Sequence, residues 1–286
     1  MESLSEVLRS RTVFKFIVGI NHIDWADMRF LTHIYTLAGA DIIDVAARPD
    51  AVATARASVA AARKEAAQAG PPPAIMVSLA LEHDPHVDTA AVAPEHRSFI
   101  VPADARALAA NARGCLDQGA DMVELHASDS DDDALQEAVE ALSGVLGGCY
   151  LSVCLGTEGV RSPRVVLRQA ALVRAIHGPQ TMIQAEGVVL TKDATPASGL
   201  QGLALAHALL AQTSACVLVA GGANEWTRRL ADMLAIPIHG IASCTYARNL
   251  VEGFRDRGSE PGDPESAVRV ARRFVRRAKG VPEDAL

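Results

Sequence analysis

Ionisable and amide side chains interrupt four short apolar runs of this sequence. They are Lys15 in residues 13–20, Asp44 in 41–47, Glu124 and His126 in 121–128, and Gln184 and Glu186 in 181–188. If these runs are neighbouring strands, the alternation of side chains turns all six groups toward one interior. An amine among carboxylates can supply a general acid, a general base or an amine nucleophile, because neighbouring charges shift one another's pKa values.

We assign catalytic roles to four of these groups and substrate contacts to the other two: Lys15, Asp44, Glu124 and Glu186, and His126 and Gln184. The same residues are also compatible with a structural role or a metal site. An ion-pair network of Lys15 with Asp44 and Glu186 would only stabilise the interior. Alternatively, Asp44, Glu124, His126 and Glu186 could bind a divalent metal. Because their spacing is a weak signal for a metal, no metal ligand is assigned.

A second group of residues lies near the end of the chain. It consists of Gly221, Gly222, Ala223 and Asn224 after one apolar run, and Ala242 and Ser243 in the next. Paired glycines at a strand-to-helix turn let backbone N–H groups approach an anion, and a following helix N-terminus favours negative charge. We therefore predict substrate phosphate contacts here, or contacts to a flavin phosphate. The alternative is that the glycines only form a tight turn and Asn224 only caps a helix.

Two long connections could bring further groups to the same place. Lys192 lies in the connection after residues 181–188 and is a candidate substrate-binding amine, although a solvated loop lysine is the alternative. Residues 82–102 contain three prolines and three histidines. A connection of that length in a compact domain is typical of a functional lid or a disordered insertion.

Eight apolar runs alternate with longer helical patterns, which predicts βα units and a parallel sheet. The expected strands are 13–20, 41–47, 74–81, 121–128, 150–157, 181–188, 215–223 and 238–243. Gly-Ala-Asp at 39–41 and at 119–121 marks two helix-to-strand corners. A chain of 286 residues fits one (β/α)8 TIM barrel of the aldolase type, with a helical extension at 256–286. No G-x-G-x-x-G follows the first strand, which disfavours a dinucleotide-binding sheet.

Alternation also predicts which side chains face the helices. On the first strand these are Phe14, Phe16, Val18 and Ile20, and on later strands Ile43, Val45, Val123, Leu125 and Ile183. The opposite positions, including Ile17 and Gly19 on the first strand, should face the barrel interior. Parallel barrels place their sites at the C-terminal ends of the strands, so the charged interior predicts a site at that rim.

Composition excludes several classes of protein. The net charge is −7 and no stripe of basic and aromatic residues is present, which argues against a nucleic-acid partner. The first residues lack a signal-peptide pattern and no apolar stretch is long enough for a membrane span, so a cytoplasmic protein is expected. The five cysteines are dispersed and should be reduced thiols. The basic helix expected at 266–279 is either solvated or packs on a partner subunit, which leaves a homo-oligomer open.

Several segments resemble a known family in order along the chain. They are FKFIVG (14–19), YTLAGADIIDVAA (35–47), IQAEG (183–187), GGAN (221–224) and IPIHGIA (236–242). Together these segments resemble the C-terminal barrel domain of the cyanobacterial light-dependent period protein and the related hypothetical chloroplast reading frame 23 family. The resemblance implies an aldolase-type barrel, with Lys15, Asp44, Glu186 and the glycine pair in its site. The clustered iron–sulfur cysteines of the cyanobacterial protein have no counterpart here, so that cofactor is not expected.

These observations lead to one expected function and to alternatives. We expect an aldolase-type lyase or synthase that acts on a small, phosphorylated carbonyl compound, with Lys15 forming a Schiff base or stabilising an enolate. A non-catalytic barrel that senses a ligand or binds a partner is the first alternative. A metal- or flavin-dependent barrel enzyme is the second.

Overall fold

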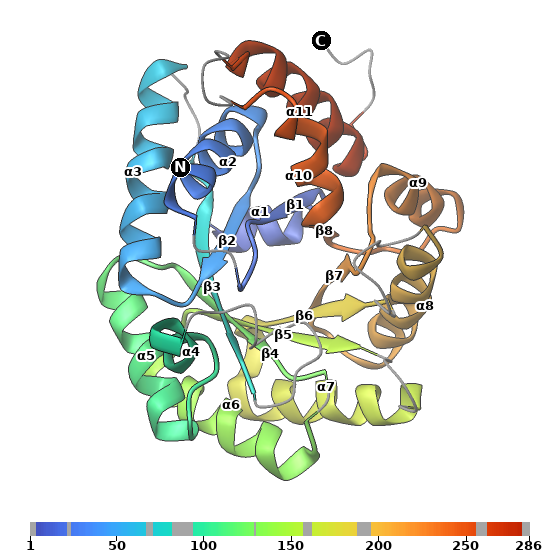
Figure 1. The fold of residues 1–286 in the computed structure, drawn as a ribbon. Helices are drawn as coiled ribbons and strands as arrows, with labels where there is room; N and C mark the ends of the chain where they lie inside the picture. Colours follow the sequence, from blue (N-terminus) through green and yellow to red (C-terminus); the bar gives the residue numbers. More distant parts are fainter. Residues whose placement is uncertain are drawn as a thin grey trace.

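The strands close into a parallel barrel (Figure 1). The computed structural model describes residues 4–21, 24–66, 71–81, 94–128, 130–156, 162–187, 196–255 and 262–281. In these ranges the strands follow one another in chain order around the barrel, and the last pairs with the first. They are β1 (Val13–Ile17), β2 (Ile42–Ala46), β3 (Ala74–Ala80), β4 (Met122–His126), β5 (Tyr150–Gly156), β6 (Thr181–Glu186), β7 (Cys216–Ala220) and β8 (Gly240–Ser243). The predicted (β/α)8 barrel is confirmed.

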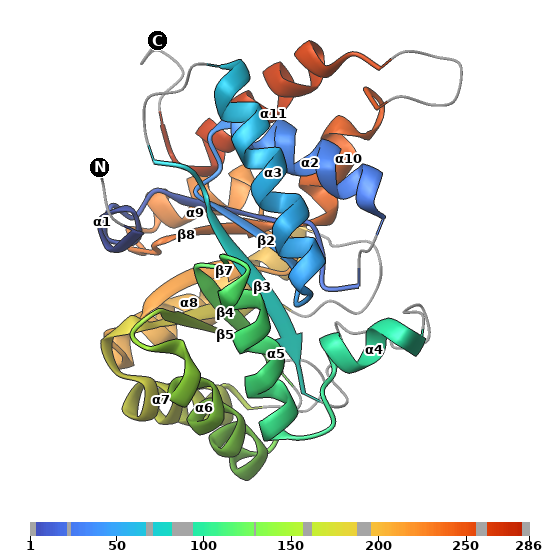
Figure 2. The same cartoon turned by 90° about the vertical axis from the view of Figure 1, so that its left-hand side faces the viewer.

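The helices surround the barrel, as Figures 1 and 2 show from two sides. They are α1 (Leu4–Arg9), α2 (Trp25–Ala38), α3 (Pro49–Glu65), α4 (Pro94–Ile100), α5 (Ala105–Asp117), α6 (Asp132–Leu146), α7 (Pro163–His177), the 3₁₀ turn η1 (Gly178–Gln180), α8 (Pro196–Gln212), α9 (Glu225–Met233), α10 (Thr245–Glu252) and α11 (Pro264–Ala278). In the described part of the chain, no helix is both long and apolar enough to cross a membrane.

Most strands end sooner than the apolar runs suggested. The first was expected to reach residue 20, but β1 stops at Ile17 and Gly19 adopts a φ of 124°. This left-handed conformation turns the chain away from its neighbours, so alternation fails beyond Val18. Ile20, expected to face the helices, instead packs with Ala80 and Ile100 at the rim.

The Gly-Ala-Asp corners have a common construction. Gly39 and Gly119 adopt φ values of 90° and 97°, and both allow a helix to end. Asp41 Oδ2 then accepts a hydrogen bond of 2.8 Å from the N–H of Phe14. At the other corner, Asp121 Oδ2 accepts one of 2.7 Å from the N–H of Ile75. Each aspartate therefore ties its corner to the strand before it, which explains why the motif occurs twice.

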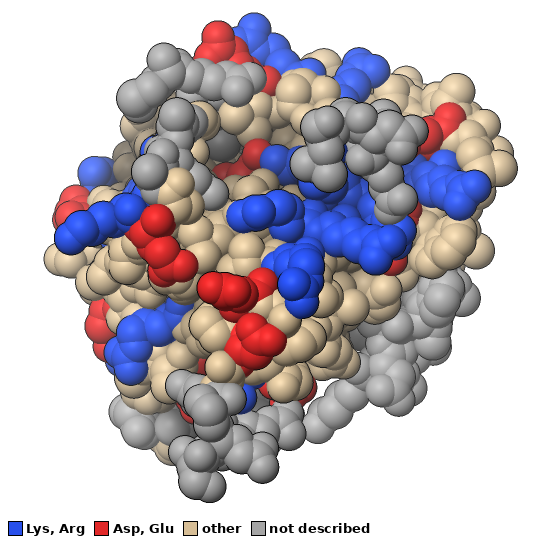
Figure 3. All heavy atoms as spheres, turned by 90° about the horizontal axis from the view of Figure 1, so that it is seen from above, with Lys and Arg blue, Asp and Glu red and all other residues tan. Residues whose placement is uncertain are grey.

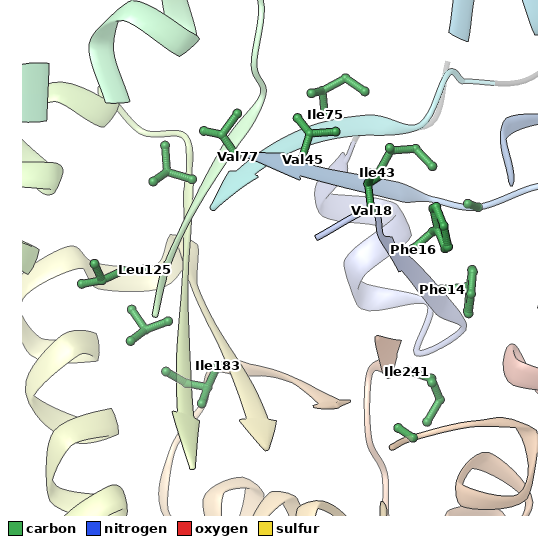
Figure 4. Close-up of a cluster of buried hydrophobic side chains, with 14 of the residues drawn as sticks. Phe14, Phe16, Val18, Ile43, Val45, Ile75, Val77, Leu125, Ile183 and Ile241 are labelled. Carbon is green, nitrogen blue, oxygen red and sulfur yellow. The ribbon is translucent and has the colours of Figure 1, made fainter. Parts of the chain in front are cut away.

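The main apolar core lies between strands and helices. Figure 4 shows Phe14, Phe16, Val18, Ile43 and Val45 on the outer side of the strands, all buried. Val123, Leu125 and Ile183 belong to the same cluster. Apart from Ile20, the predicted helix-facing positions are confirmed.

The barrel interior at the N-terminal ends of the strands is apolar as well. It is filled by one side chain from most strands and closed by α1: Leu8, Val13, Ile42, Met76, Met122, Met182 and Leu218. This layer excludes water from below, so the polar groups above it are reached only from the C-terminal rim.

Two irregular segments differ in part from expectation. Of the predicted lid, residues 82–93 lie outside the described residues, and residues 94–100 form helix α4. The basic helix begins at Pro264, two residues before its predicted start, because Asp263 caps it and proline suits a first turn. It packs against α2, α9 and α10, which places it between the first and last helices of the ring.

Candidate active site at the barrel rim

Lys15 is the centre of a polar layer above the apolar floor. Its side chain has no exposed surface, and Nζ lies 2.9 Å from Asp44 Oδ2 and 2.5 Å from Glu124 Oε1. Nζ also donates to Gln184 Oε1 at 2.9 Å. The predicted ion pair with Asp44 is present. Lys15 pairs with Glu124 rather than Glu186, which corrects the network expected from the sequence.

Two serines complete this layer. Ser78 Oγ donates to Asp44 Oδ1 at 2.7 Å, and Ser152 Oγ donates to Glu124 Oε2 at 2.6 Å. Glu124 therefore accepts hydrogen bonds from Lys15 and Ser152, whereas Asp44 accepts one from Ser78 and forms an ion pair with Lys15. Such pairing is what allows buried charges to persist.

The charges stabilise one another unequally. Burial alone would lower the pKa of Lys15, but attraction by Asp44 and Glu124 outweighs it and holds that pKa above the usual 10.5. Burial opposes ionisation of Glu124, yet Lys15 and His126 hold its pKa below the usual 4.5. Burial raises the pKa of Asp44, and the neighbouring Glu124 adds to this against the attraction of Lys15. At neutral pH Lys15 is therefore an ammonium and Glu124 a carboxylate.

His126 and Glu186 lie one step closer to solvent. His126 Nε2 is 3.4 Å from Glu124 Oε1, and Gln184 Nε2 donates to Glu186 Oε1 at 3.2 Å. Glu124 and Gln184 thus connect Lys15 below to an imidazole and a carboxylate above. The two upper side chains are 7% and 5% exposed, enough for contact with a small ligand.

A pocket of about 350 Å³ opens over these two groups at the C-terminal rim. Its lining in the described chain consists of Ile17, Gly19, Ile20, Asn21, His126, Glu186, Gly221, Gly222, Ala223, Ala242, Ser243, Cys244, Thr245, Tyr246 and Arg248. The structure therefore brings one predicted catalytic residue, Glu186, together with the predicted substrate contact His126 and the predicted glycine turn at one cavity. Lys15, Asp44, Glu124 and Gln184 lie beneath it and do not line it.

The glycine turn has a steric cause. Gly221 and Gly222 adopt φ values of 65° and 86°. A Cβ on Gly221 would lie 2.9 Å from the backbone N and O of Gly187, at the end of β6. Glycine is thus needed for both conformation and space, and the turn packs tightly beside Glu186 while its backbone faces the pocket.

Arg248 is a pocket residue that the sequence analysis missed. It lies in the first turns of α10, and its Nη2 donates to the carbonyl of Val18 at the end of β1. Among the residues that the structure describes, none accepts a hydrogen bond from its buried Nε. A guanidinium is a permanent cation with several donors, so Arg248 gives the pocket an anion-binding group. Its position five residues after the last predicted strand was the available signal.

The remaining predicted residues have separate outcomes. Asn224 lies outside the described lining of the pocket, and its Oδ1 accepts from the N–H groups of Trp226 and Thr227 in a capping box, as the helix-cap alternative expected. Lys192 lies outside the described residues. The described His, Cys, Asp and Glu side chains form no group of three or more arranged to bind a metal. All five cysteines are free thiols, as expected.

The closed parallel barrel and its rim pocket define an aldolase-type (β/α)8 barrel. The sequence matches no protein-family model and none of the curated proteins. Its fold is similar to a truncated 3-deoxy-D-arabino-heptulosonate 7-phosphate synthase from Thermotoga maritima, at 11% identity and a TM-score of 0.53 over 94% of this chain and 87% of that chain. It is also similar to the YdjI aldolase from Escherichia coli K12, at 12% identity and a TM-score of 0.53 over 96% and 92%.

A third similarity extends to a different chemistry. An octameric ribulose-1,5-bisphosphate carboxylase/oxygenase from Pyrococcus horikoshii OT3 shares 9% identity and a TM-score of 0.59, over 99% of this chain and 62% of that chain. At such identities the similarities show the fold alone. Because one barrel supports many reactions, the function must be argued from the site.

Proposed function

We propose that this protein is an aldolase-type lyase or synthase that acts on a small, phosphorylated carbonyl compound. One observation carries the proposal: a single rim pocket contains His126 and Glu186 on its floor and Gly221, Gly222 and Arg248 on its wall. The first pair can transfer protons, and the second group can bind a phosphate or carboxylate. Structures of similar fold include enzymes named for phosphorylated sugars, which supports the substrate class.

The chemistry follows from the order of these groups. The substrate phosphate binds at Arg248 and the glycine turn, which directs the carbonyl toward the floor. The Glu186 carboxylate removes a proton from the carbon beside the carbonyl, and His126 donates a hydrogen bond to the carbonyl oxygen as an enolate forms. The enolate carbon then attacks a second carbonyl, a C–C bond forms, and the new alkoxide takes the proton that Glu186 holds. Cleavage is the reverse sequence.

Lys15 serves in this proposal as a counter-ion. It fixes Glu124, and Glu124 in turn faces His126 Nε2. The Schiff-base version of the proposal requires a neutral amine that reaches the pocket. The raised pKa of Lys15, which the attraction of Asp44 and Glu124 maintains against burial, and its complete burial favour the counter-ion role.

Proton exchange tests the proposal without knowledge of the second substrate. Dihydroxyacetone phosphate and glycolaldehyde phosphate are incubated with the protein in D₂O, and deuterium beside the carbonyl is measured by NMR. We expect exchange by the wild type and a loss of roughly 10²–10⁴-fold in Glu186→Gln. Arg248→Met should weaken binding of inorganic phosphate, measured by calorimetry, and leave the fold intact.

Two controls make the result interpretable. Glu137→Gln changes an exposed carboxylate on α6, outside the described lining of this pocket, and should exchange as the wild type does. Borohydride trapping followed by intact mass tests the Schiff base, and an adduct that disappears in Lys15→Ala would replace the counter-ion role by a nucleophilic one. If neither compound exchanges and phosphate does not bind, the enzymatic proposal fails and the non-catalytic ligand- or partner-binding barrel suggested by the family resemblance takes its place.

A further inference from the structure

Exposed large apolar side chains gather around helix α9. In the described chain these side chains are Leu200 on α8, Trp226 and Met233 on α9, Leu234 at its C-cap, and Tyr246 on α10. Trp226 is 63% exposed and Met233 73%. Single exposed apolar residues are normal on any protein, but a cluster on one face marks an interaction surface. The α9 surface, as we call these five residues, lies on the side of the barrel opposite α3 in Figure 1.

The α9 surface is a ridge between two grooves. A groove of about 600 Å³ lies between α9 and the end of α11, and its lining includes Arg277 and Val281. A second groove, of about 430 Å³, lies toward α8 and includes Leu200 and Met233. Trp226 and Arg229 line both. Helices pack by placing the ridge of one in the groove of another, so this shape accepts a second helix that presents a similar ridge.

The charged side chains along α9 indicate which helix packs on this ridge. Glu225, Arg229 and Asp232 follow one another at helical spacing along α9 and line the larger groove together. Arg229 also lies 5.5 Å from the centre of the Trp226 ring. A partner of one charge sign would be attracted by part of this row and repelled by the rest. An antiparallel copy of α9 instead brings each Arg229 beside the partner's Asp232, a carboxylate that Arg228 of its own helix also contacts at 2.9 Å.

We infer that the α9 surface is the two-fold interface of a homodimer of this chain. In a two-fold interface the same patch serves both subunits, so contacts occur in symmetric pairs. Trp226 of one subunit then packs near Met233 of the other, and Arg229 pairs with Asp232 across the axis. A large aromatic residue and an arginine at the centre are typical of the residues that dominate binding energy.

Helix α11 is a poorer candidate for the same role. Arginines line one groove along it: Arg269, Arg272, Arg273, Arg276 and Arg277. Figure 3, seen from the side where α11 lies at the top of Figure 1, shows Lys and Arg side chains gathered in one band. Two copies of a surface with one sign of charge repel each other, so the basic helix does not explain self-association.

The dimer would lie beside the rim pocket. Tyr246 lines that pocket, and its hydroxyl donates to Glu225 Oε1 on α9 at 3.3 Å. Association at α9 therefore fixes a residue that holds one wall of the pocket. The inference does not depend on the reaction, because it rests on surface residues alone.

A charge-swap experiment tests the interface with the full chain. Sedimentation velocity should show a dimer for the wild type at roughly micromolar concentration. Arg229→Glu and Asp232→Lys should each raise the dissociation constant by about 30-fold or more. An equimolar mixture of the two variants should form a heterodimer, because each opposed pair then has opposite charges. Glu137→Arg, an exposed charge reversal on α6, is the matched control and should stay dimeric.

Trp226 provides a second readout that needs no charge variant. The chain has two tryptophans, and the emission of Trp226 should shift to shorter wavelength as the protein is concentrated. Trp226→Phe should abolish this shift while far-UV circular dichroism stays unchanged. A wild type that is monomeric at every concentration, or variants that associate as tightly as the wild type, would overturn the inference.

Discussion

Removing the charge of Lys15 should destabilise the protein strongly, because it leaves buried carboxylates without their cation. Lys15→Met keeps an unbranched side chain that is one atom shorter, and loses the contacts of 2.9 Å to Asp44 and 2.5 Å to Glu124. All three side chains are at most 1% exposed, so solvent does not replace the lost partner. Breaking a buried pair in this way costs roughly 3–5 kcal/mol.

The expected loss is large enough for thermal unfolding to measure. At roughly 2–4 °C per kcal/mol for a chain near this size, Tm should fall by about 6–20 °C at pH 7. Glu124→Gln should lower the stability less than Lys15→Met does, because Lys15 keeps its ion pair with Asp44. The double variant should be more stable than the sum of the single losses predicts, by about 1–3 kcal/mol, because it removes both members of one pair.

The pH dependence has a defined sign. The folded pKa of Glu124 lies below the usual 4.5 because Lys15 and His126 outweigh the effect of burial. The stability that this carboxylate contributes is therefore fully present above pH 4.5 and is lost as the pH falls below it. The pKa of Asp44 shifts the other way, and the part of that shift caused by Glu124 is lost in Glu124→Gln, so it opposes the change that Glu124 produces. The stability gap between wild type and Glu124→Gln should accordingly narrow below pH 4.5.

Differential scanning calorimetry between pH 3 and pH 8 would check both expectations, over a range set by the ordinary pKa values of carboxylates and histidine. A Tm of Lys15→Met within about 2 °C of the wild type at pH 7 would refute the reasoning. Strict additivity of the two substitutions would refute it as well, because residues in direct contact should couple.

Three further substitutions separate steric from capping effects. Gly221→Ala should lower the free energy of unfolding by roughly 3 kcal/mol or more, because a Cβ meets Gly187 at 2.9 Å in addition to the strain of a positive φ. Gly39→Ala, where nothing lies within 4 Å of the added Cβ, should lower it by only about 1–2 kcal/mol. Equal losses of the two variants in urea titrations would contradict the close approach at Gly221. Asn224→Ala should cost about 1 kcal/mol through loss of the α9 cap and leave phosphate affinity at the rim unchanged, so weaker calorimetric binding would instead make Asn224 a ligand contact.

The fold could be predicted because its signals are local. Side chains alternate along a strand whatever the strand pairs with, so Phe14, Phe16 and Lys15 were assigned to their faces from the sequence. Gly39 and Gly119 marked helix ends because only a left-handed residue turns the chain there. The same local rules placed His126 and Glu186 inside the barrel.

Only the closed barrel decided which of these groups meet. In the backbone register of the strands, Asp44 lies opposite Ile17 rather than Lys15, and Glu124 lies opposite Ser78. The strands are thus staggered around a tilted barrel, and height along a strand does not follow from sequence position. That stagger brings Glu124 to Lys15 across the interior and leaves Glu186 nearer the rim.

Contacts between segments that are distant in the sequence likewise could not be predicted from the sequence. Arg248 reaches the rim because α10 begins directly above β8 and β8 pairs with β1, where Val18 accepts its hydrogen bond. Trp226 and Tyr246 share one surface because Glu225 joins α9 to α10. Local sequence determined which groups are available, and the closure of the barrel determined which of them act together.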